Sequence, residues 1–116
     1  VFFFCGPRTG NNIEIRRMHY SLKKEEVPED KTGVFMEKDS WQLAKKFFSK
    51  VERFYFQNPV RFDSAEALYK YWSSYNLYDA RFDSAFKNAA NDHFKKNSVF
   101  ETVKRVIGVK ATKKVT

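Results

Sequence analysis

Residues that build cross-linked or metal-binding sites are scarce in this chain. It holds one cysteine and two histidines among its 116 residues. A single cysteine cannot form an intramolecular disulfide, and because Cys5 lies in an apolar run, we expect it to be a small core side chain. Two histidines without clustered cysteines or spaced carboxylates argue against a metal site.

Long apolar runs and glycine-rich loops are missing as well. No run approaches the length of a membrane-spanning helix and no signal-peptide pattern opens the sequence, so we expect a cytoplasmic protein with no membrane partner. The chain has four glycines, and they form neither a G-x-G-x-x-G loop nor a P-loop. No Ser-His-Asp or zinc pattern occurs either, and the sequence identifies no catalytic residue.

Aromatic and basic residues, in contrast, are abundant. Hydrophobic residues make up 42% of the chain and aromatic residues 18%, which is enough for a core and argues against disorder. The length fits a single domain over 1–116, or a C-terminal subdomain. The net charge of +8 suggests an anionic partner. The lysine pairs are dispersed near the ends of predicted helices, however, which favours a solvated face.

The first five residues, Val1 to Cys5, form a bare apolar run that Gly6-Pro7 closes. Short runs of this kind are typical of strands buried on both faces inside a parallel sheet. Such a strand needs neighbours on both sides, and no residues precede it here to supply one. We therefore expect the chain to be the back part of a larger protein.

Helix and strand signals then alternate along the chain. Asn11 and Glu14 have the spacing of a capping box and predict a helix over 12–22, followed by a loop over 23–33. A break at Asn58-Pro59 predicts an interrupted strand at a sheet edge. The remaining pattern predicts helices at 39–50, 63–72 and 82–96, with capping boxes at Asp39/Gln42 and Asp63/Glu66, strands at 51–62 and 99–111, and a flexible tail at 112–116.

The predicted order is strand, helix, helix, strand, helix, helix, strand. Alternation of this kind is typical of an α/β sheet with helical cover. Three strands make a thin sheet for about four helices. This mismatch again indicates that further strands belong to the complete fold.

Several stretches resemble a known family, the class I S-adenosylmethionine-dependent methyltransferases of bacteria. The run Val1 to Pro7 and the stretch Asn11-Asn12-Ile13-Glu14 are similar to the fifth strand of these enzymes and the start of the helix after it. Residues 51–72 resemble their sixth strand and the insertion after it, with Asn58-Pro59-Val60-Arg61-Phe62 and Tyr71-Trp72 as the matching motifs. Residues 94–109 resemble their last, antiparallel strand. The resemblance covers nearly the whole chain, but only the C-terminal half of such an enzyme.

The resemblance implies a partial Rossmann-like sheet of three strands, in which the last strand is antiparallel and lies between the other two. It also implies the substrate-side portion of an enzyme that transfers a methyl group from S-adenosylmethionine to a small molecule. In that family the glycine-rich cofactor loop and the acidic residue that binds the ribose lie in the N-terminal half. We therefore expect no cofactor binding and no activity from this chain alone, and the N-terminal cofactor-binding half as its partner.

The candidate substrate-binding residues are polar side chains that follow the first strand: Arg8, Asn11, Asn12, Arg17 and Tyr20. Backbone N–H groups at the start of a helix bind anions, and Arg8 can add a bidentate contact. The alternative interpretation of Asn11 is an ordinary helix cap with Glu14. His19 is a candidate base or substrate contact, and its alternative is a surface or half-buried helix histidine.

A second hypothesis is a stand-alone basic α+β module that binds nucleic acid or an acidic protein. Aromatic residues near basic ones, as around Tyr71 and Trp72, can stack on single-stranded nucleic acid. Trp72 lies on a helical apolar stripe with Leu68, however, where core packing is the commoner cause. The module hypothesis predicts a binding affinity that falls as the salt concentration rises. It also predicts that Val1–Cys5 has a neighbour on each side, supplied from within these residues. A third hypothesis is a folded fragment with no activity of its own.

Overall fold

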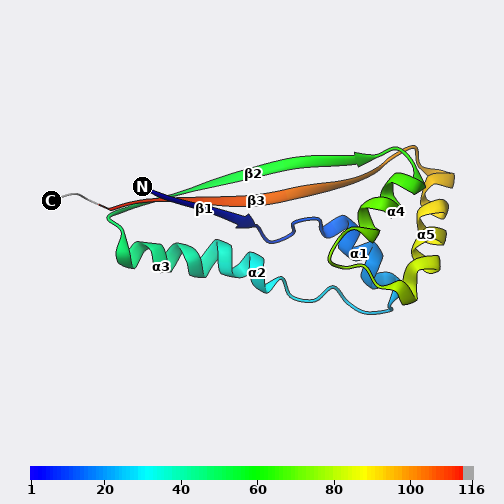
Figure 1. Cartoon of the computed structure of the whole chain (residues 1–116), viewed down its shortest axis with the longest axis horizontal. Helices are drawn as coiled ribbons and strands as arrows, with labels where there is room; N and C mark the ends of the chain where they lie inside the picture. The colour runs from blue at the N-terminus through cyan, green and yellow to red at the C-terminus, as the bar shows by residue number, and fades with distance from the viewer. Residues whose placement is uncertain (114–116) are drawn as a thin grey trace. The chain divides into compact units, whose positions relative to one another are not determined.

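The computed structural model of the chain describes residues 1–113. Its elements follow in the order β1 (Phe2–Pro7), α1 (Ile13–Leu22), α2 (Lys31–Val34), a π-helical turn (Phe35–Asp39), α3 (Ser40–Phe47), β2 (Lys50–Phe62), α4 (Ala65–Ser73), a 3-10 turn (Ala80–Phe82), α5 (Asp83–Lys96) and β3 (Phe100–Thr112) (Figure 1). Because α2, the π turn and α3 follow one another without a break, the described residues hold four helical segments. The predicted alternation of strands and helix pairs is confirmed, and the fold is α/β.

The strands form one sheet in the order β1-β3-β2, with β3 in the middle. β3 runs antiparallel to β1, in a register that joins Phe2 with Ala111 and Pro7 with Val106. Figure 1 shows that β2 and β3 also run in opposite directions. The last strand thus lies reversed between the other two, as predicted.

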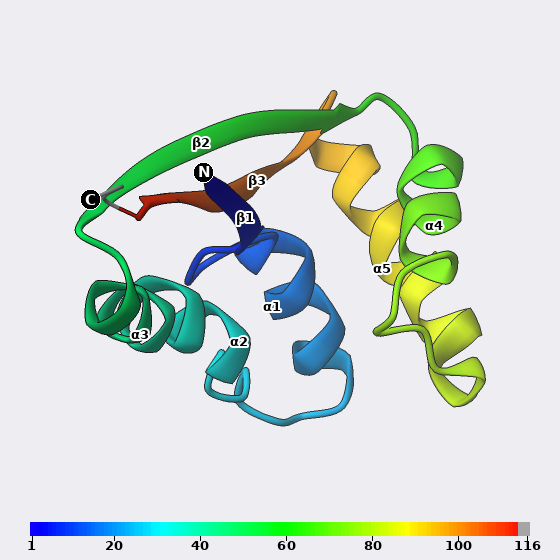
Figure 2. The ribbon, with the colours of Figure 1, turned by 60° about the vertical axis from the view of Figure 1, so that its left-hand side comes forward.

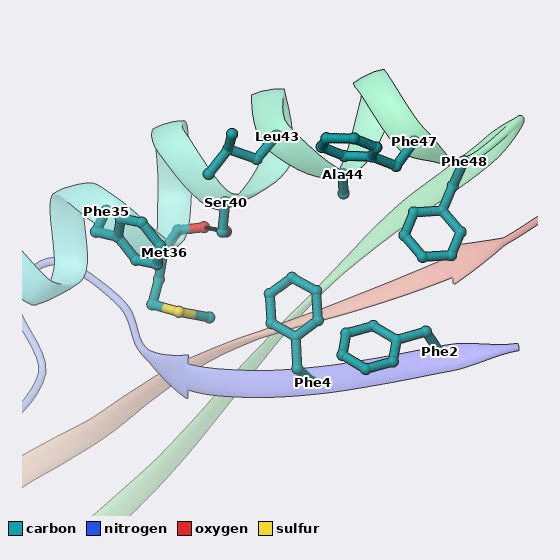
Figure 3. A pocket seen from close by; sticks show the side chains of 9 residues that line it. All are labelled: Phe2, Phe4, Phe35, Met36, Ser40, Leu43, Ala44, Phe47 and Phe48. Atoms are coloured by element: carbon teal, nitrogen blue, oxygen red, sulfur yellow. Dashed lines mark hydrogen bonds between the residues drawn. The ribbon is translucent and has the colours of Figure 1, made fainter.

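The chain divides into two compact units. The first comprises residues 1–11, 29–58 and those from 104 onward, and the second comprises 12–28 and 59–103. In the first unit, α3 lies along one face of β1 (Figure 2), and Phe2 and Phe4 are on that face (Figure 3). In the second unit, α4 and α5 pack side by side (Figures 1 and 2).

The core of the second unit is aromatic. Trp72 of α4 is fully buried and stacks on Phe86 of α5, with 4.2 Å between the ring centroids. Leu68 and Ile15, both fully buried, belong to the same cluster. The indole Nε1–H donates to Nδ1 of His19 at 3.0 Å, so the polar atom of the buried ring is satisfied. The apolar stripe predicted from Leu68 and Trp72 is therefore confirmed.

β1 forms where the apolar run predicts a strand, but the prediction that this strand is buried on both faces is wrong. Phe2 and Phe3 are neighbours in the strand, so their side chains point to opposite faces, and each is 54% exposed. Cys5 is exposed as well, so its prediction as a core side chain is wrong. The reason is that β1 lies at an edge of the sheet, and α3 covers only one of its faces.

The capping box predicted for α1 is wrong, because its two side chains bind elsewhere. α1 begins after Asn12, which has left-handed backbone (φ 53°) and makes no side-chain cap. Oδ1 of Asn11 accepts from the N–H of Arg105 at 2.8 Å. A carboxylate oxygen of Glu14 accepts from the N–H of Val103 at 3.1 Å. Both side chains therefore hold β3 rather than the start of the helix.

Two other helices begin at different residues than predicted. The helical segment predicted from Asp39 begins instead at Lys31, so the predicted loop is shorter. Its cap is Asp30, whose carboxylate accepts from the N–H of Gly33 at 2.9 Å. α4 is capped by Ser64, whose hydroxyl accepts from the N–H of Ala67, in place of the predicted pair Asp63/Glu66.

β2 lies at the other edge of the sheet, as predicted, but it continues through Pro59 without the predicted break. An edge strand leaves some of its N–H groups outside the ladder, and a proline at such a position removes no ladder hydrogen bond. Thr112, the first residue of the predicted flexible tail, is the last residue of β3. The rest of that tail, from 114 to 116, lies outside the described residues.

Truncation of the buried Leu68 should destabilise the second unit. Leu68→Ala leaves a cavity in a fully buried cluster, so we expect a loss of about 2 to 5 kcal/mol in the free energy of unfolding. Leu43→Ala is the matched control, because Leu43 is 47% exposed, and we expect it to lose less than about 1 kcal/mol. Urea unfolding followed by circular dichroism measures both. Equal losses would contradict this core.

Candidate functional site

A polar loop follows the end of β1 and is fixed to β3. Pro7 is the last paired residue of β1, opposite Val106, and the next N–H, of Arg8, still donates to the carbonyl of Arg105 at 2.8 Å. The chain then turns through Gly10, whose φ of +84° is strained for other residues. Nη1 of Arg105 donates to the carbonyl of Gly10 at 2.7 Å. Backbone and side-chain hydrogen bonds therefore hold the loop in one conformation.

Glu37, in the π turn, holds the same loop through its carboxylate. Its Oε1 accepts from the N–H of Thr9 and from Nε of Arg8, both at 3.1 Å. Burial alone would raise the pKa of this carboxyl, but the hydrogen bonds from Thr9 and Arg8 outweigh burial and lower the pKa below its ordinary value. Glu37 is therefore charged at neutral pH and fixes both the backbone and the arginine side chain after β1.

The π turn approaches β1 closely at Gly6. The Sδ of Met36 lies 3.0 Å from the position that a Cβ on Gly6 would take. A Cβ at this position would require the side chain of Met36, the neighbour of Glu37, to shift by a few tenths of an ångström. Single π turns inside helices often occur at functional sites, because they re-aim side chains that a regular helix would place elsewhere.

Two arginines that contact Glu37, here called the arginine pair, are Arg8 and Arg53. The guanidinium carbon of Arg8 lies 4.4 Å from the ring centroid of Tyr55, and that of Arg53 lies 4.3 Å from the ring centroid of Trp41. Nη1 of Arg53 also donates to the carbonyl of Glu37 at 3.1 Å. Contact with an aromatic ring restricts each guanidinium but leaves its charge and its remaining N–H donors in place.

An apolar groove of about 330 Å³ lies between β1 and the helical segment that ends with α3. Figure 3 shows Phe2 and Phe4 on the strand side and Leu43 and Phe47 on the helix side. Its lining residues are Phe2, Phe4, Phe35, Met36, Ser40, Leu43, Ala44, Phe47 and Phe48. The Ser40 hydroxyl donates to the carbonyl of Met36 at 2.6 Å. The groove therefore suits apolar contacts and offers little hydrogen bonding.

The predicted substrate-binding residues are divided between the two units. Arg8 and Asn11 belong to the first unit, and Asn12, Arg17 and Tyr20 belong to the second. Arg17 is exposed on α1, and Tyr20 is half-buried on the same helix. Their contact with a substrate stays a prediction.

Asn12 is a structural residue in this fold. It is 2% exposed, its Nδ2 donates to the hydroxyl of Tyr71 at 2.9 Å, and its Oδ1 accepts from the hydroxyl of Thr102 at 3.4 Å. The amide nitrogen and the amide oxygen thus each have a partner within the second unit, which holds the buried side chain in place. Contact of Asn12 with a substrate also stays a prediction.

The sequence did not identify Glu37, Arg53 or Tyr55 as site residues. Arg53 and Tyr55 alternate with phenylalanines along β2, and this alternation was the available signal that both share a face. No local pattern marks Glu37, because its partners Arg8 and Thr9 lie 29 and 28 residues away in the sequence.

The glycines of this chain do not form a cradle for S-adenosylmethionine. The Cβ position of Gly33 lies 2.7 Å from the backbone nitrogen of Thr9, and that of Gly108 lies 2.9 Å from the ring of Phe3. The space beside Gly6 holds Met36, and the remaining glycine forms the turn after β1. At Gly6, Gly33 and Gly108, residues of the chain itself thus fill the space that a close approach of a nucleotide would need, so these glycines do not fit the cofactor.

The described residues offer neither a metal cluster nor a membrane-spanning helix. Among residues 1–113, no three His, Cys, Asp or Glu side chains gather closely enough to hold a metal ion. No helix in this part of the chain has the length and apolar character required to cross a membrane. Neither models of known protein families nor the curated proteins give a match to the chain.

His19 is buried, whereas the alternative interpretation of the sequence places this histidine on the surface or half-buried on its helix. It is 2% exposed, and its Nδ1 accepts the hydrogen bond from Trp72. Burial, followed by the charge of Lys23, lowers the pKa of His19 below its ordinary value of 6.5. The ring therefore serves the core as a neutral acceptor, and its Nδ1 is not available as a base.

Acidification below about pH 6.5 should destabilise the second unit. The unfolded chain takes up the His19 proton at a higher pH than the folded chain, because the folded pKa is lowered. The stabilisation is thus complete above the unfolded pKa and is lost as the pH falls through the folded pKa. Protonation would also place a donor against the indole N–H of Trp72. Urea unfolding at a series of pH values measures this loss.

His19→Gln is the control for this pH dependence. Its amide oxygen can accept the indole hydrogen bond but does not titrate, so its free energy of unfolding should vary less with pH over the same range. Parallel pH profiles for the variant and the unaltered chain would contradict the assignment to His19.

Proposed function

We propose that the chain is the C-terminal, substrate-side portion of an S-adenosylmethionine-dependent methyltransferase that acts on a small molecule. The observation that carries the proposal is the strand order β1-β3-β2 with β3 reversed. Consecutive strands of a fold usually pair with each other. An order in which the last strand separates the first two is therefore informative, and it agrees with the partial Rossmann-like sheet that the resemblance to this family implies.

β1 supports the proposal through its exposed faces. Within residues 1–113 it pairs with β3 only, so one of its edges has no neighbouring strand. Phe3 and Phe56 meet over Gly108 on the face opposite α3, and they are 54% and 51% exposed. Sheets of mostly parallel α/β proteins are covered on both faces. A further strand and helices from an N-terminal half would cover both surfaces.

In this proposal the residues described here bind and orient the methyl acceptor. The methyl donor is already activated, so transfer depends mainly on close positioning of the acceptor. The cofactor belongs to the N-terminal half, because the glycines of this chain do not fit it. The loop of Arg8 lies beyond the carboxyl end of β1, where open α/β sheets bind their ligands. The exposed, unpaired thiol of Cys5 suits a reducing cytoplasm, where we place the enzyme.

A second candidate function is the basic binding module. The observation that favours it is the exposed stretch of β2, where Tyr55 is 49% exposed beside Arg8 of the arginine pair. Exposed aromatic rings next to arginines can stack on nucleic-acid bases. The module also predicts two neighbours for β1 within the chain, and only β3 pairs with it among the described residues.

Calorimetric titration with S-adenosylmethionine tests the first proposal. We expect no binding to the 116-residue chain and binding to a longer protein in which the N-terminal half precedes it. Phe3→Asp should change the stability of the short chain little, because Phe3 is 54% exposed. In the longer protein it should cost several kcal/mol more, because the charge would be buried.

Phe47→Asp is the control, since this side chain is 70% exposed and lies on α3 rather than on the uncovered sheet face. Tight cofactor binding by the short chain, or none by the longer protein, would overturn the proposal. Salt-sensitive binding of a single-stranded oligonucleotide to the short chain would favour the module instead.

A further inference from the structure

We infer that Arg8 anchors a binding site for a small oxyanion, a carboxylate or phosphate group, beyond the carboxyl end of β1. The inference that this oxyanion belongs to the methyl acceptor rests on the proposed function. The site itself rests on the geometry of the first unit alone. The inference names a substrate class, a methyl acceptor with an anionic group. The site can be tested in the absence of the cofactor.

The side chain of Arg8 is held in place but keeps part of its hydrogen-bonding capacity. Nε donates to Glu37 and the guanidinium lies over the ring of Tyr55, so two contacts restrict its position. Within residues 1–113, the structure shows no hydrogen bond from either Nη atom of Arg8, and the side chain is 34% exposed. The edge that carries both Nη atoms matches the two oxygens of a carboxylate or phosphate. An arginine already restricted in this way loses little rotamer freedom when it binds.

The charges around the loop also favour an anion. Arg53 donates to the carbonyl of Glu37, and Arg105 donates to the carbonyl of Gly10. The Glu37 carboxylate is the acidic group in direct contact with Arg8. Asp30, the other carboxylate near the loop, accepts from the N–H of Gly33. The arginines outnumber these two carboxylates, so an incoming oxyanion meets a positive field.

Arg81, in the second unit, shows how the N–H donors of a guanidinium are engaged when a carboxylate of the chain lies beside them. It donates through Nε and Nη2 to the two carboxylate oxygens of Asp79, at 3.1 and 2.7 Å. These hydrogen bonds from Arg81 are the main reason why the pKa of Asp79 is lowered to about 2. Arg8 has one such bond, through Nε, and its remaining edge lacks this kind of partner among the described residues. Arg81 is therefore the matched control.

Titrations of the 116-residue chain followed by NMR test the site. The probes are inorganic phosphate in one arm and acetate in the other, with chloride at matched ionic strength as the reference. We expect saturable shifts of the Arg8 Nε–H and Thr9 N–H signals. Arg8→Gln should weaken the binding, read from Thr9, at least about tenfold, because a charge-assisted bidentate contact is lost. Arg81→Gln should leave the affinity unchanged.

Glu37→Gln separates an anion site from a purely structural ion pair. The amide oxygen can still accept from Thr9 and Arg8, while the negative charge beside the guanidinium is gone. We expect anion affinity to rise about threefold, the size typical of one partly exposed charge interaction. A structural pair alone would give this variant no gain in affinity. Arg8→Lys, which keeps the charge but not the two-nitrogen edge, should bind more weakly than the unaltered chain.

The two arms identify the oxyanion, since saturation by phosphate alone assigns a phosphate group and saturation by acetate assigns a carboxylate. Shifts that do not saturate, that match those in chloride, or that persist in Arg8→Gln would overturn the site. The titration contains no S-adenosylmethionine, so failure of the methyltransferase proposal would leave its result unchanged. Failure of the titration would likewise leave the cofactor experiment intact.

Discussion

β3 continues past the end of β1, and the rest of the structure depends on the hydrogen bonds that it makes there. In the first unit they fix the loop after β1, and in the second unit they fix the start of α1. β1 stops pairing at Pro7, opposite Val106, and on that edge of β3 the next backbone groups would have no strand beside them. In the first unit, the carbonyl of Arg105 accepts from the N–H of Arg8, and its N–H donates to Asn11. Backbone groups left without a partner on burial cost about as much as a lost hydrogen bond. The loop after β1 therefore takes its conformation from β3 as much as from its own sequence.

In the second unit the same requirement explains an unusual backbone conformation. The carbonyl of Val103 accepts from the N–H of Asn12 at 2.9 Å, and its N–H donates to Glu14. Asn12 has a φ of 53°, which asparagine tolerates better than most residues. Its amide is bound on both sides, to Tyr71 and Thr102, so these contacts offset the strain. The start of α1 is thus set by long-range contacts rather than by a cap.

These contacts also separate what the sequence predicts from what it leaves open. Leu68 and Trp72 lie one helical turn apart, and their burial follows from local periodicity. Asn11 and Glu14 fit a capping box equally well, but their actual partners in β3 lie 94 and 89 residues away. Local spacing cannot tell these two uses apart. The apolar run before Cys5 likewise predicts a strand, yet its exposure depends on which segments cover the sheet.

The candidate site, too, is only partly predictable. The sequence gives the residue types, but it does not show how their side chains are oriented. Arg8 is marked by its place after a strand, whereas the carboxylate that orients it comes from a π turn that approaches β1 beside Gly6. The dispersion of the lysine pairs favours a solvated face for them, and this interpretation does not extend to the arginines. A guanidinium that lies over Tyr55 and is tied through one nitrogen is a directed donor rather than a diffuse charge. Recognition by this protein is therefore better judged from how its arginines are held than from how many cations it carries.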